Sequence, residues 1–294
     1  MADFGTVGYG MGGGFADGAP GIPGKGSRKA PPGVFEEARL SFNRRAMSWY
    51  GIIAFLLLWQ LAPYAGITDR DFIPPLSVVA AEALRLAVGG ELFLHIASSC
   101  QRVLIGLFLA VLVAIPAAVL LAGFFPRVTR FLSPLLALLG NINPFALFPL
   151  FILLFGVGEG AKLAIIFWSS LFPILNFAIH GVQAVDPTYI KAARGMGADR
   201  PRIFWKVVIP GALPSIFTGF KMGATTAFLF LIAAEMLAAN SGLGYLVHNA
   251  SLNYFIPRIY VGVLGIAILG MGFTVLIDKA EKLVLGHKEE AKAG

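Results

Sequence analysis

Residues 187–214 read PTYIKAARGMGADRPRIFWKVVIPGALP, and this stretch determines how the rest of the chain is interpreted. It is basic and rich in helix-forming residues, and it lies between two long apolar segments, about 161–182 and 211–238. Uncharged apolar segments of this length span a bilayer. A polar helical hairpin exposed between two membrane spans is expected to be a docking surface for another protein, although an ordinary amphipathic loop is the alternative.

The hairpin has recognisable start and stop signals. Asp186 is expected to N-cap a first helix that has Pro187 at its first position. That helix should end near Met196, because Gly197 readily adopts the left-handed conformation that terminates helices. Asp199 is expected to cap a second helix.

The second helix should run through Pro201 to about Val208. Pro210 and Pro214 are then expected to break the chain as the next span begins. Ala192 and Ala193 are small, and we expect them to leave a shallow helix face that a partner can approach closely.

Composition identifies the chain as a polytopic membrane protein. Of its 294 residues, 57% are hydrophobic and only 13% are charged, against about 25% in soluble domains, and the mean hydropathy is +0.78. The net charge of +7 does not indicate nucleic-acid binding, because the basic residues flank the apolar spans. The single cysteine, Cys100, excludes a disulfide framework, and the four histidines lack ligand spacing, so no metal site is expected.

The chain divides into three parts. Residues 1–46 are rich in glycine and proline and are expected to be disordered, with a possible interfacial helix at 34–46. Residues 47–280 form the transmembrane domain, and residues 281–294 form a cytoplasmic tail. Residues 74–88 are predicted to form a helix that is too short and too charged to cross the membrane. Six spans are predicted, at about 47–66, 92–123, 128–155 (interrupted at 141–144), 161–182, 211–238 and 257–279.

The distribution of Lys and Arg predicts the orientation of these spans. With the N-terminus inside, 17 of the 23 basic residues lie in cytoplasmic segments, four lie outside, and two fall within spans. This bias follows the positive-inside rule. Both termini and the loop at 186–210 are therefore expected in the cytoplasm.

The hairpin resembles the EAA loop of ATP-binding cassette (ABC) importer permeases. That motif is Glu-Ala-Ala, three residues, Gly, nine residues, then Ile, any residue, Leu and Pro. Here Lys191 replaces the Glu, and Val207 and Ile209 replace the Ile and Leu. The resemblance implies an ATPase-coupling loop at 186–210, with coupling residues Lys191, Ala192, Ala193, Arg194, Gly197 and Pro210.

Two further stretches resemble the nitrate/sulfonate/taurine branch of these permeases. One is PFALFPLFILLFGVG at 144–158, and the other combines Ala234-Glu235-Met236 with Gly242-Leu243-Gly244. The resemblance covers about residues 47–280. It implies an all-α fold of the type I ABC importer (molybdate/methionine-permease-like), with about six transmembrane helices, in a bacterial inner membrane.

The resemblance also implies partners. Two permease copies, most simply a homodimer, would form the pathway, two cytosolic ATPase subunits would bind ATP and Mg, and a periplasmic binding protein would deliver a small anion such as nitrate, a sulfonate or taurine. This chain would itself be neither an enzyme nor the holder of a cofactor. Residues 24–27, GKGS, lack the spacing of a nucleotide-binding loop. The coupling loop is expected to act as a rigid lever on the spans beside it.

Polar residues within the spans are candidates for the translocation pathway. Glu235 either lines the pathway or hydrogen-bonds a neighbouring span or the Ser241–Gly244 loop. The amides of Asn141, Asn143 and Asn176 either bind an anion or join helices, and Thr225 either lines the pathway or caps a carbonyl. Arg102 and Lys221 are expected near the cytosolic ends of spans, reaching to the interface. The alternative for either cation is to line the cavity and attract an oxyanion.

Two other classes of protein remain as alternatives. An ion-driven secondary carrier often shows internal repeats and several intramembrane acids, whereas Glu235 is the clearest intramembrane carboxylate here. A membrane scaffold that recruits an unrelated soluble partner would also expose a polar hairpin.

Overall fold

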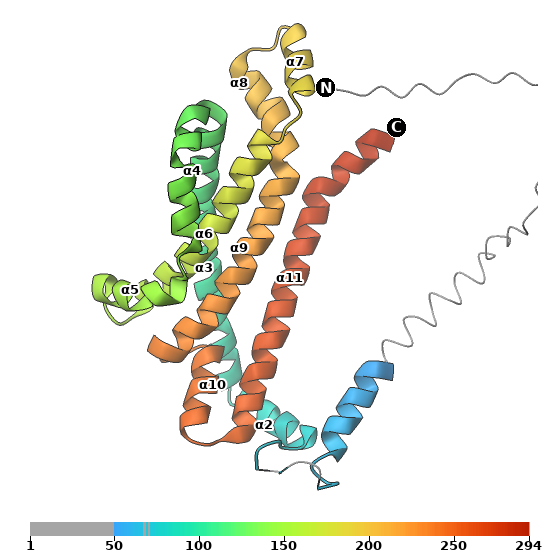
Figure 1. The fold of residues 1–294 in the computed structure, drawn as a ribbon. Helices are drawn as coiled ribbons and strands as arrows, with labels where there is room; N and C mark the ends of the chain where they lie inside the picture. The colour runs from blue at the N-terminus through green and yellow to red at the C-terminus, as the bar shows by residue number, and fades with distance from the viewer. Residues whose placement is uncertain (1–49, 67–68, 70, 294) are drawn as a thin grey trace, which may run out of the picture. The chain divides into compact units, whose positions relative to one another are not determined.

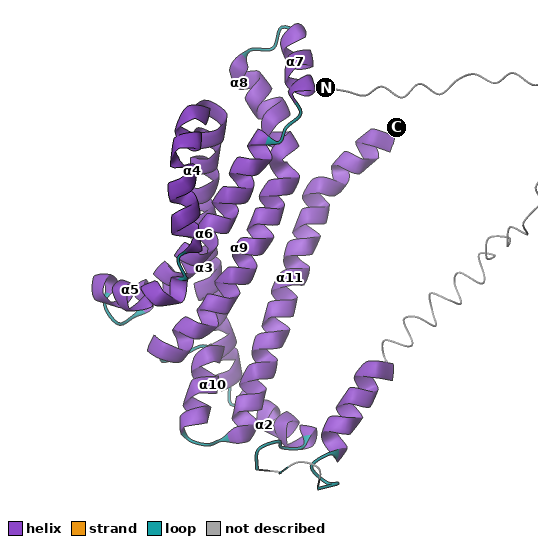
Figure 2. Cartoon of the chain, in the orientation of Figure 1, coloured by secondary structure: helices purple, strands orange, loops and turns teal. Residues whose placement is uncertain are grey.

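A computed structural model describes residues 50–66, 69 and 71–293 of the chain, with side chains described up to residue 284. The predicted extension at 1–46 lies outside the described residues. Residues 50–55 belong to the first of two compact units, and the second unit begins at Leu56. The described part consists of helices joined by loops and turns (Figure 2).

Four continuous helices are long and apolar enough to cross a membrane, by length and composition. They are built on α3 (Glu91–Ala118), α6 (Glu159–Gln183), α9 (Ile209–Ala238) and α11 (Ile256–Ala293) (Figure 1). These match the predicted second, fourth, fifth and sixth spans. Of the predicted first span, the described residues show a shorter apolar helix, Tyr50–Leu61.

The predicted third span is broken where the sequence indicated. Helix α4 (Pro126–Asn141) and helix α5 (Phe148–Phe155) are joined by Ile142, Asn143 and a 3-10 turn, and the two halves are bent by 81°. The side chain of Asn143 accepts a hydrogen bond from the Phe145 N–H at 3.0 Å and so caps the turn. A bend of this size makes the segment either a broken span or a re-entrant loop.

Shorter helices complete the described part. The predicted short helix at 74–88 is present as α2 (Leu76–Val88). Helix α10 (Leu243–Leu252) lies between α9 and α11. Helix α11 continues through residue 280, so the predicted tail starts within a helix rather than after one.

Helices α6 and α9 approach each other closely because α9 carries glycines where the two meet. A Cβ at Gly219 would lie 2.6 Å from the Cβ of Phe177, and one at Gly223 would lie 2.7 Å from the Ile174 side chain. Side-chain atoms do not tolerate such distances. Inside a bilayer the hydrophobic effect does not drive helices together. Small residues at helix contacts stabilise the association instead, because they permit close van der Waals packing.

The chain does not break at Pro210 and Pro214, which corrects the sequence prediction. Helix α8 (Arg200–Ile203), a π-helical turn (Phe204–Val208) and α9 form one uninterrupted helical segment. Within that turn the Ile209 N–H donates to the Phe204 carbonyl, five residues back. A π-helical turn of this kind accommodates the missing proline N–H without ending the helix.

Candidate functional site

The first helix of the hairpin is α7 (Pro187–Gly195), which we call the coupling helix. As predicted, Asp186 caps it: the Thr188 N–H donates to its carboxylate at 2.8 Å. That backbone hydrogen bond, aided by the Thr188 side chain, lowers the pKa of Asp186 below its usual value. A negative charge at a helix N-terminus also interacts favourably with the helix dipole and so stabilises the helix.

The coupling helix ends in a Schellman motif at Gly197. The Gly197 N–H donates to the Arg194 carbonyl at 3.0 Å, and the Ala198 N–H donates to the Ala193 carbonyl at 3.1 Å. Gly197 has a φ of +80°, and a Cβ there would meet nothing within 4 Å. Only backbone conformation, and not space, therefore restricts this position to glycine.

The predicted coupling residues divide into an exposed and a buried set. Lys191, Ala192 and Arg194 are exposed on the coupling helix. Ala193 is buried within the hydrophobic core, so the expectation that both alanines form an open face is wrong for Ala193. The helical period explains the difference, because adjacent residues point about 100° apart.

The buried side of the hairpin is continuous with the transmembrane core. Ala193, Ile203, Phe204 and Val208 belong to the same cluster as buried residues of α3, α6 and α9. The Phe204 ring packs against Phe124 at a centroid distance of 5.1 Å. Because α8 also continues directly into α9, the hairpin is connected to the spans both by packing and by an unbroken helix.

A second polar site lies at the opposite ends of these helices, around Glu235 on α9. Its carboxylate is fully buried. It accepts hydrogen bonds from the Ser99 hydroxyl at 2.8 Å and from the Gly244 N–H at 2.9 Å, and it pairs with Arg102 at 2.8 Å. These are the partners that the sequence interpretation named as the alternative to a pathway role, namely a neighbouring span and the loop at 241–244.

Arg102 is the centre of this site, and its predicted position is corrected. It is 6% exposed and lies in the first half of α3, which the predicted orientation places on the outer side rather than near the cytosolic end. All five guanidinium N–H donors have acceptors: two bonds go to Glu159 at 2.7 and 2.8 Å, one to Glu235, and two to the Ser241 carbonyl and hydroxyl at 2.6 and 3.0 Å. Because every donor of this guanidinium has an acceptor, the side chain is stabilised without extending to the membrane–water interface.

The loop after α9 closes over the carboxylate. Gly242 has a φ of +118°, and a Cβ there would overlap Oε1 of Glu235. The Gly242 N–H donates to Nδ1 of His95 at 3.1 Å, and the Leu243 N–H donates to the Ser99 hydroxyl at 2.9 Å. Helix α3, the end of α9 and the start of α10 are thereby held together.

Sequence reasoning did not identify this site as a unit. His95, Ser99 and Arg102 are spaced i, i+4 and i+7, which places them on one face of a helix. That spacing was the available signal. The remaining members come from distant parts of the chain: Glu159 and buried Lys162, which pair at 2.6 Å, and Ser241.

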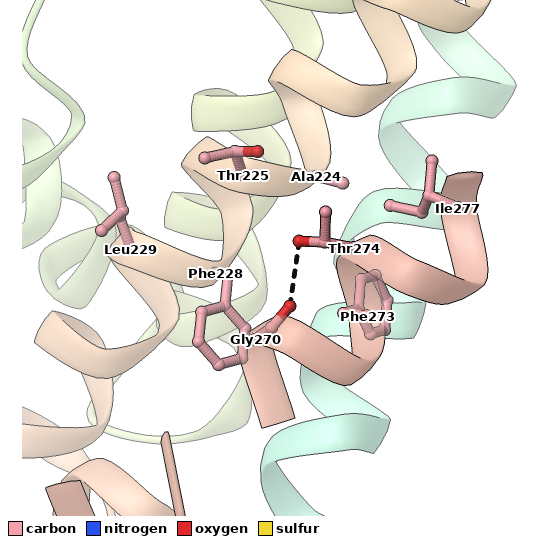
Figure 3. Close-up of a pocket in the computed structure, with 8 residues that line it drawn as sticks. All are labelled: Ala224, Thr225, Phe228, Leu229, Gly270, Phe273, Thr274 and Ile277. Carbon is pink, nitrogen blue, oxygen red and sulfur yellow. Dashed lines mark hydrogen bonds between the residues drawn. The ribbon is translucent and has the colours of Figure 1, made fainter. Parts of the chain in front are cut away.

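The structure does not bring the predicted pathway residues together. Asn141 and Asn143 are exposed around the bend between α4 and α5, and Asn176 lines a cavity between α4 and α6. Thr225 lines a separate cavity of about 200 Å³ between α9 and α11, together with Thr274 (Figure 3). The Thr225 hydroxyl also donates to the Lys221 carbonyl at 2.9 Å, as the alternative interpretation expected.

Lys221 forms ion pairs rather than lining a site. It pairs with Asp278 at 2.8 Å and with Glu281, both on α11. Among the described residues, no group of three or more His, Cys, Asp or Glu side chains is arranged to hold a metal ion.

The bent helix pair, the long spans and the helical hairpin between α6 and α9 define a membrane-spanning permease of the ABC-importer class. The chain belongs to the family of binding-protein-dependent transport system inner membrane components, whose model matches residues 110–284. It is therefore a multi-pass inner-membrane protein, as predicted.

Individual relatives agree with the predicted branch. The taurine transport system permease protein TauC of Escherichia coli is 33% identical over 79% of this chain and 86% of its own length. The bicarbonate transport system permease protein CmpB of Synechocystis is 30% identical over 80% and 87%. The inward-facing MetNI methionine ABC transporter gives a TM-score of 0.57 at 19% identity, covering 65% of this chain and 94% of its own, which confirms the type I importer fold.

Proposed function

We propose that this chain is the transmembrane subunit of an ATP-driven importer that takes a small anion from a periplasmic binding protein. The coupling helix is the observation that carries the proposal. It is polar and exposed on one side, and its other side is packed into the core that joins α3, α6 and α9. A partner that moves the coupling helix would therefore move the spans.

The partner is proposed to be a pair of ATPase subunits that bind ATP and Mg and close on each other during the cycle. Two copies of this chain would rock as rigid bodies and alternate the access of the pathway. Lys191 is exposed on the coupling helix. Because it stands where a Glu is typical, we expect the facing ATPase surface to carry an acidic group in this system.

The anionic substrate class is inferred from the relatives. Their names specify taurine, aliphatic sulfonates and bicarbonate. Each of these carries an oxyanion group, so we propose that the cargo carries a sulfonate, carboxylate or similar group.

Gly197→Val tests the lever. A β-branched residue at φ +80° is strongly strained, so the turn after the coupling helix should rearrange. We expect ATP-driven taurine uptake into proteoliposomes containing the ATPase and binding protein to fall at least about tenfold, while membrane insertion is unchanged. Gly195→Val is the matched control, because Gly195 has no positive φ and a Cβ there also meets nothing within 4 Å.

Equal uptake by the two variants would refute the lever. Uptake that needs an ion gradient but neither ATP nor the binding protein would instead identify a secondary carrier.

A further inference from the structure

A polar cavity of about 410 Å³ lies between α4 and α6, away from the buried Arg102 site. Ligand pockets commonly have volumes of about 300–1,000 Å³. The cavity is lined from α4 by Thr129, Arg130, Ser133, Leu136 and Ala137, and from α6 by Asn176, Ile179, His180 and Gln183.

The polar lining follows helical periodicity on both sides. On α6, Asn176, His180 and Gln183 are spaced i, i+4 and i+7, and on α4 Arg130 and Ser133 are spaced i and i+3. Residues at these spacings share one face of a helix. Two polar faces therefore oppose each other across the cavity. His180 is exposed there.

The cavity lies at the cytosolic ends of both helices. Arg130 is in the second turn of α4, and Gln183 is the last residue of α6, three residues before the cap of the coupling helix. The distribution of basic residues places both ends in the cytoplasm. The cavity is thus adjacent to the element that we propose is moved by ATP.

The side chains that line the cavity favour the binding of an anion. The lining contains a guanidinium, an imidazole and two carboxamides, but none of the described residues that line it is a carboxylate. Arg130 forms no salt bridge within 4 Å with any residue that the structure describes, in contrast to Arg102 and Lys221.

The hydroxyl groups in the cavity already donate elsewhere. The Thr129 hydroxyl donates to the carbonyls of Leu121 and Phe125, and the Ser133 hydroxyl donates to the Arg130 carbonyl at 3.3 Å. The donors that remain for a ligand are therefore those of Arg130, Asn176, His180 and Gln183.

We propose that this cavity is a cytosol-facing site for a small oxyanion of the sulfonate, sulfate or carboxylate class. Arg130 supplies the charge and a planar pair of donors that matches two oxyanion oxygens, and the amides of Asn176 and Gln183 orient the anion. That the bound anion is imported cargo about to enter the cytosol rests on the proposed function. The expectation that the isolated permease binds the anion does not rest on it.

The test uses the full-length chain in nanodiscs of phosphatidylcholine, titrated with sodium sulfate by calorimetry at constant ionic strength. We expect saturable binding that weakens at least about tenfold in Arg130→Gln, since each 1.4 kcal/mol of lost interaction is tenfold. Asn176→Leu should weaken it less. Arg127→Gln, one turn earlier on α4, is the matched control, because Arg127 is exposed and does not line the cavity.

Three outcomes would overturn the site. They are no sulfate binding to the wild type, equal binding to wild type and Arg130→Gln, and equal weakening by Arg127→Gln. A lipid headgroup is the other source of the same chemistry. Discs containing phosphatidylglycerol, examined by native mass spectrometry, would overturn the soluble-ligand proposal if they showed Arg130-dependent lipid retention without sulfate competition.

The result can be separated from the proposed function. Sulfate binding without ATP-driven uptake would leave the site standing and remove the importer. ATP-driven uptake without sulfate binding would support the importer and refute the anion site.

Discussion

At the scale of single residues, Arg102 is the side chain on which the most distant contacts converge. It connects α3 to Glu159 on α6, to Glu235 on α9 and to the loop that begins α10. The side chain of Glu235 is 0% exposed, and Arg102 lies 2.8 Å from its carboxylate. Removal of one member of a buried pair costs about 3–5 kcal/mol, whereas replacement of both by apolar residues is often close to neutral.

The prediction at this scale is a double-mutant cycle. Arg102→Leu should lower the free energy of unfolding by about 3–5 kcal/mol, because it leaves the Glu235 charge buried without its cation. Arg102→Leu combined with Glu235→Leu should recover part of that loss. Denaturant unfolding in detergent measures both, with exposed Arg127→Leu as the control. A double variant less stable than Arg102→Leu alone would contradict this account.

At the scale of elements, the tight contact of α6 with α9 makes the pair suitable as a lever. The hairpin connects these two helices, and its second half is the direct start of α9. Close packing resists the sliding of α6 past α9, because a densely packed interior has few voids that could absorb the motion. Gly219, on α9, sits at this contact.

Gly219→Ala therefore tests whether the contact is tight. An added methyl at 2.6 Å from the Phe177 Cβ should destabilise the protein by about 1–3 kcal/mol. Gly272→Ala on α11 is the matched control, since nothing lies within 4 Å of its Cβ. That control should be neutral or stabilise by up to about 1 kcal/mol, because Ala favours helix over Gly. The opposite order of unfolding midpoints would show that the contact is loose.

At the scale of the whole molecule, the coupling helix, the α4–α6 cavity and the Arg102 site divide between opposite membrane faces. The coupling helix and the α4–α6 cavity are assigned to the cytoplasm, and the Arg102 site to the outer side. This assignment depends on the orientation that the Lys and Arg distribution predicts. It also places Glu82 outside, where burial acts to raise its pKa but hydrogen bonds from Arg85 and Arg258 lower it overall.

Cysteine labelling checks the orientation. In a Cys100→Ala background, Val88→Cys on α2 should react with a membrane-impermeant maleimide in intact spheroplasts. Met196→Cys, beside the coupling helix, should react only after permeabilisation. Both native side chains are 82% exposed, so accessibility is matched. Labelling of Met196→Cys in intact spheroplasts would invert the topology and move the proposed anion site outside.

Local patterns in the sequence predicted much of this architecture. Apolar length identified the four continuous helices that are long enough to cross a membrane, because the bilayer sets that length. Asp186 and Gly197 predicted the ends of the coupling helix, because capping depends on neighbouring residues only. Asn143 and Pro144 marked the break between α4 and α5. Each of these features is determined within a few residues of chain.

Only the tertiary structure decided the contacts that join distant segments. In the structure the helix continues through Pro210, because the π-helical turn before Pro210 accommodates the missing proline N–H. The tertiary structure buried Ala193 and Arg102, and it brought Glu159 and Glu235 to one guanidinium across α6 and α9. It also set Arg130 opposite Asn176. The sequence by itself determined the four long apolar helices and where the hairpin turns, whereas the partner of each intramembrane charge depends on three-dimensional packing that no local pattern encodes.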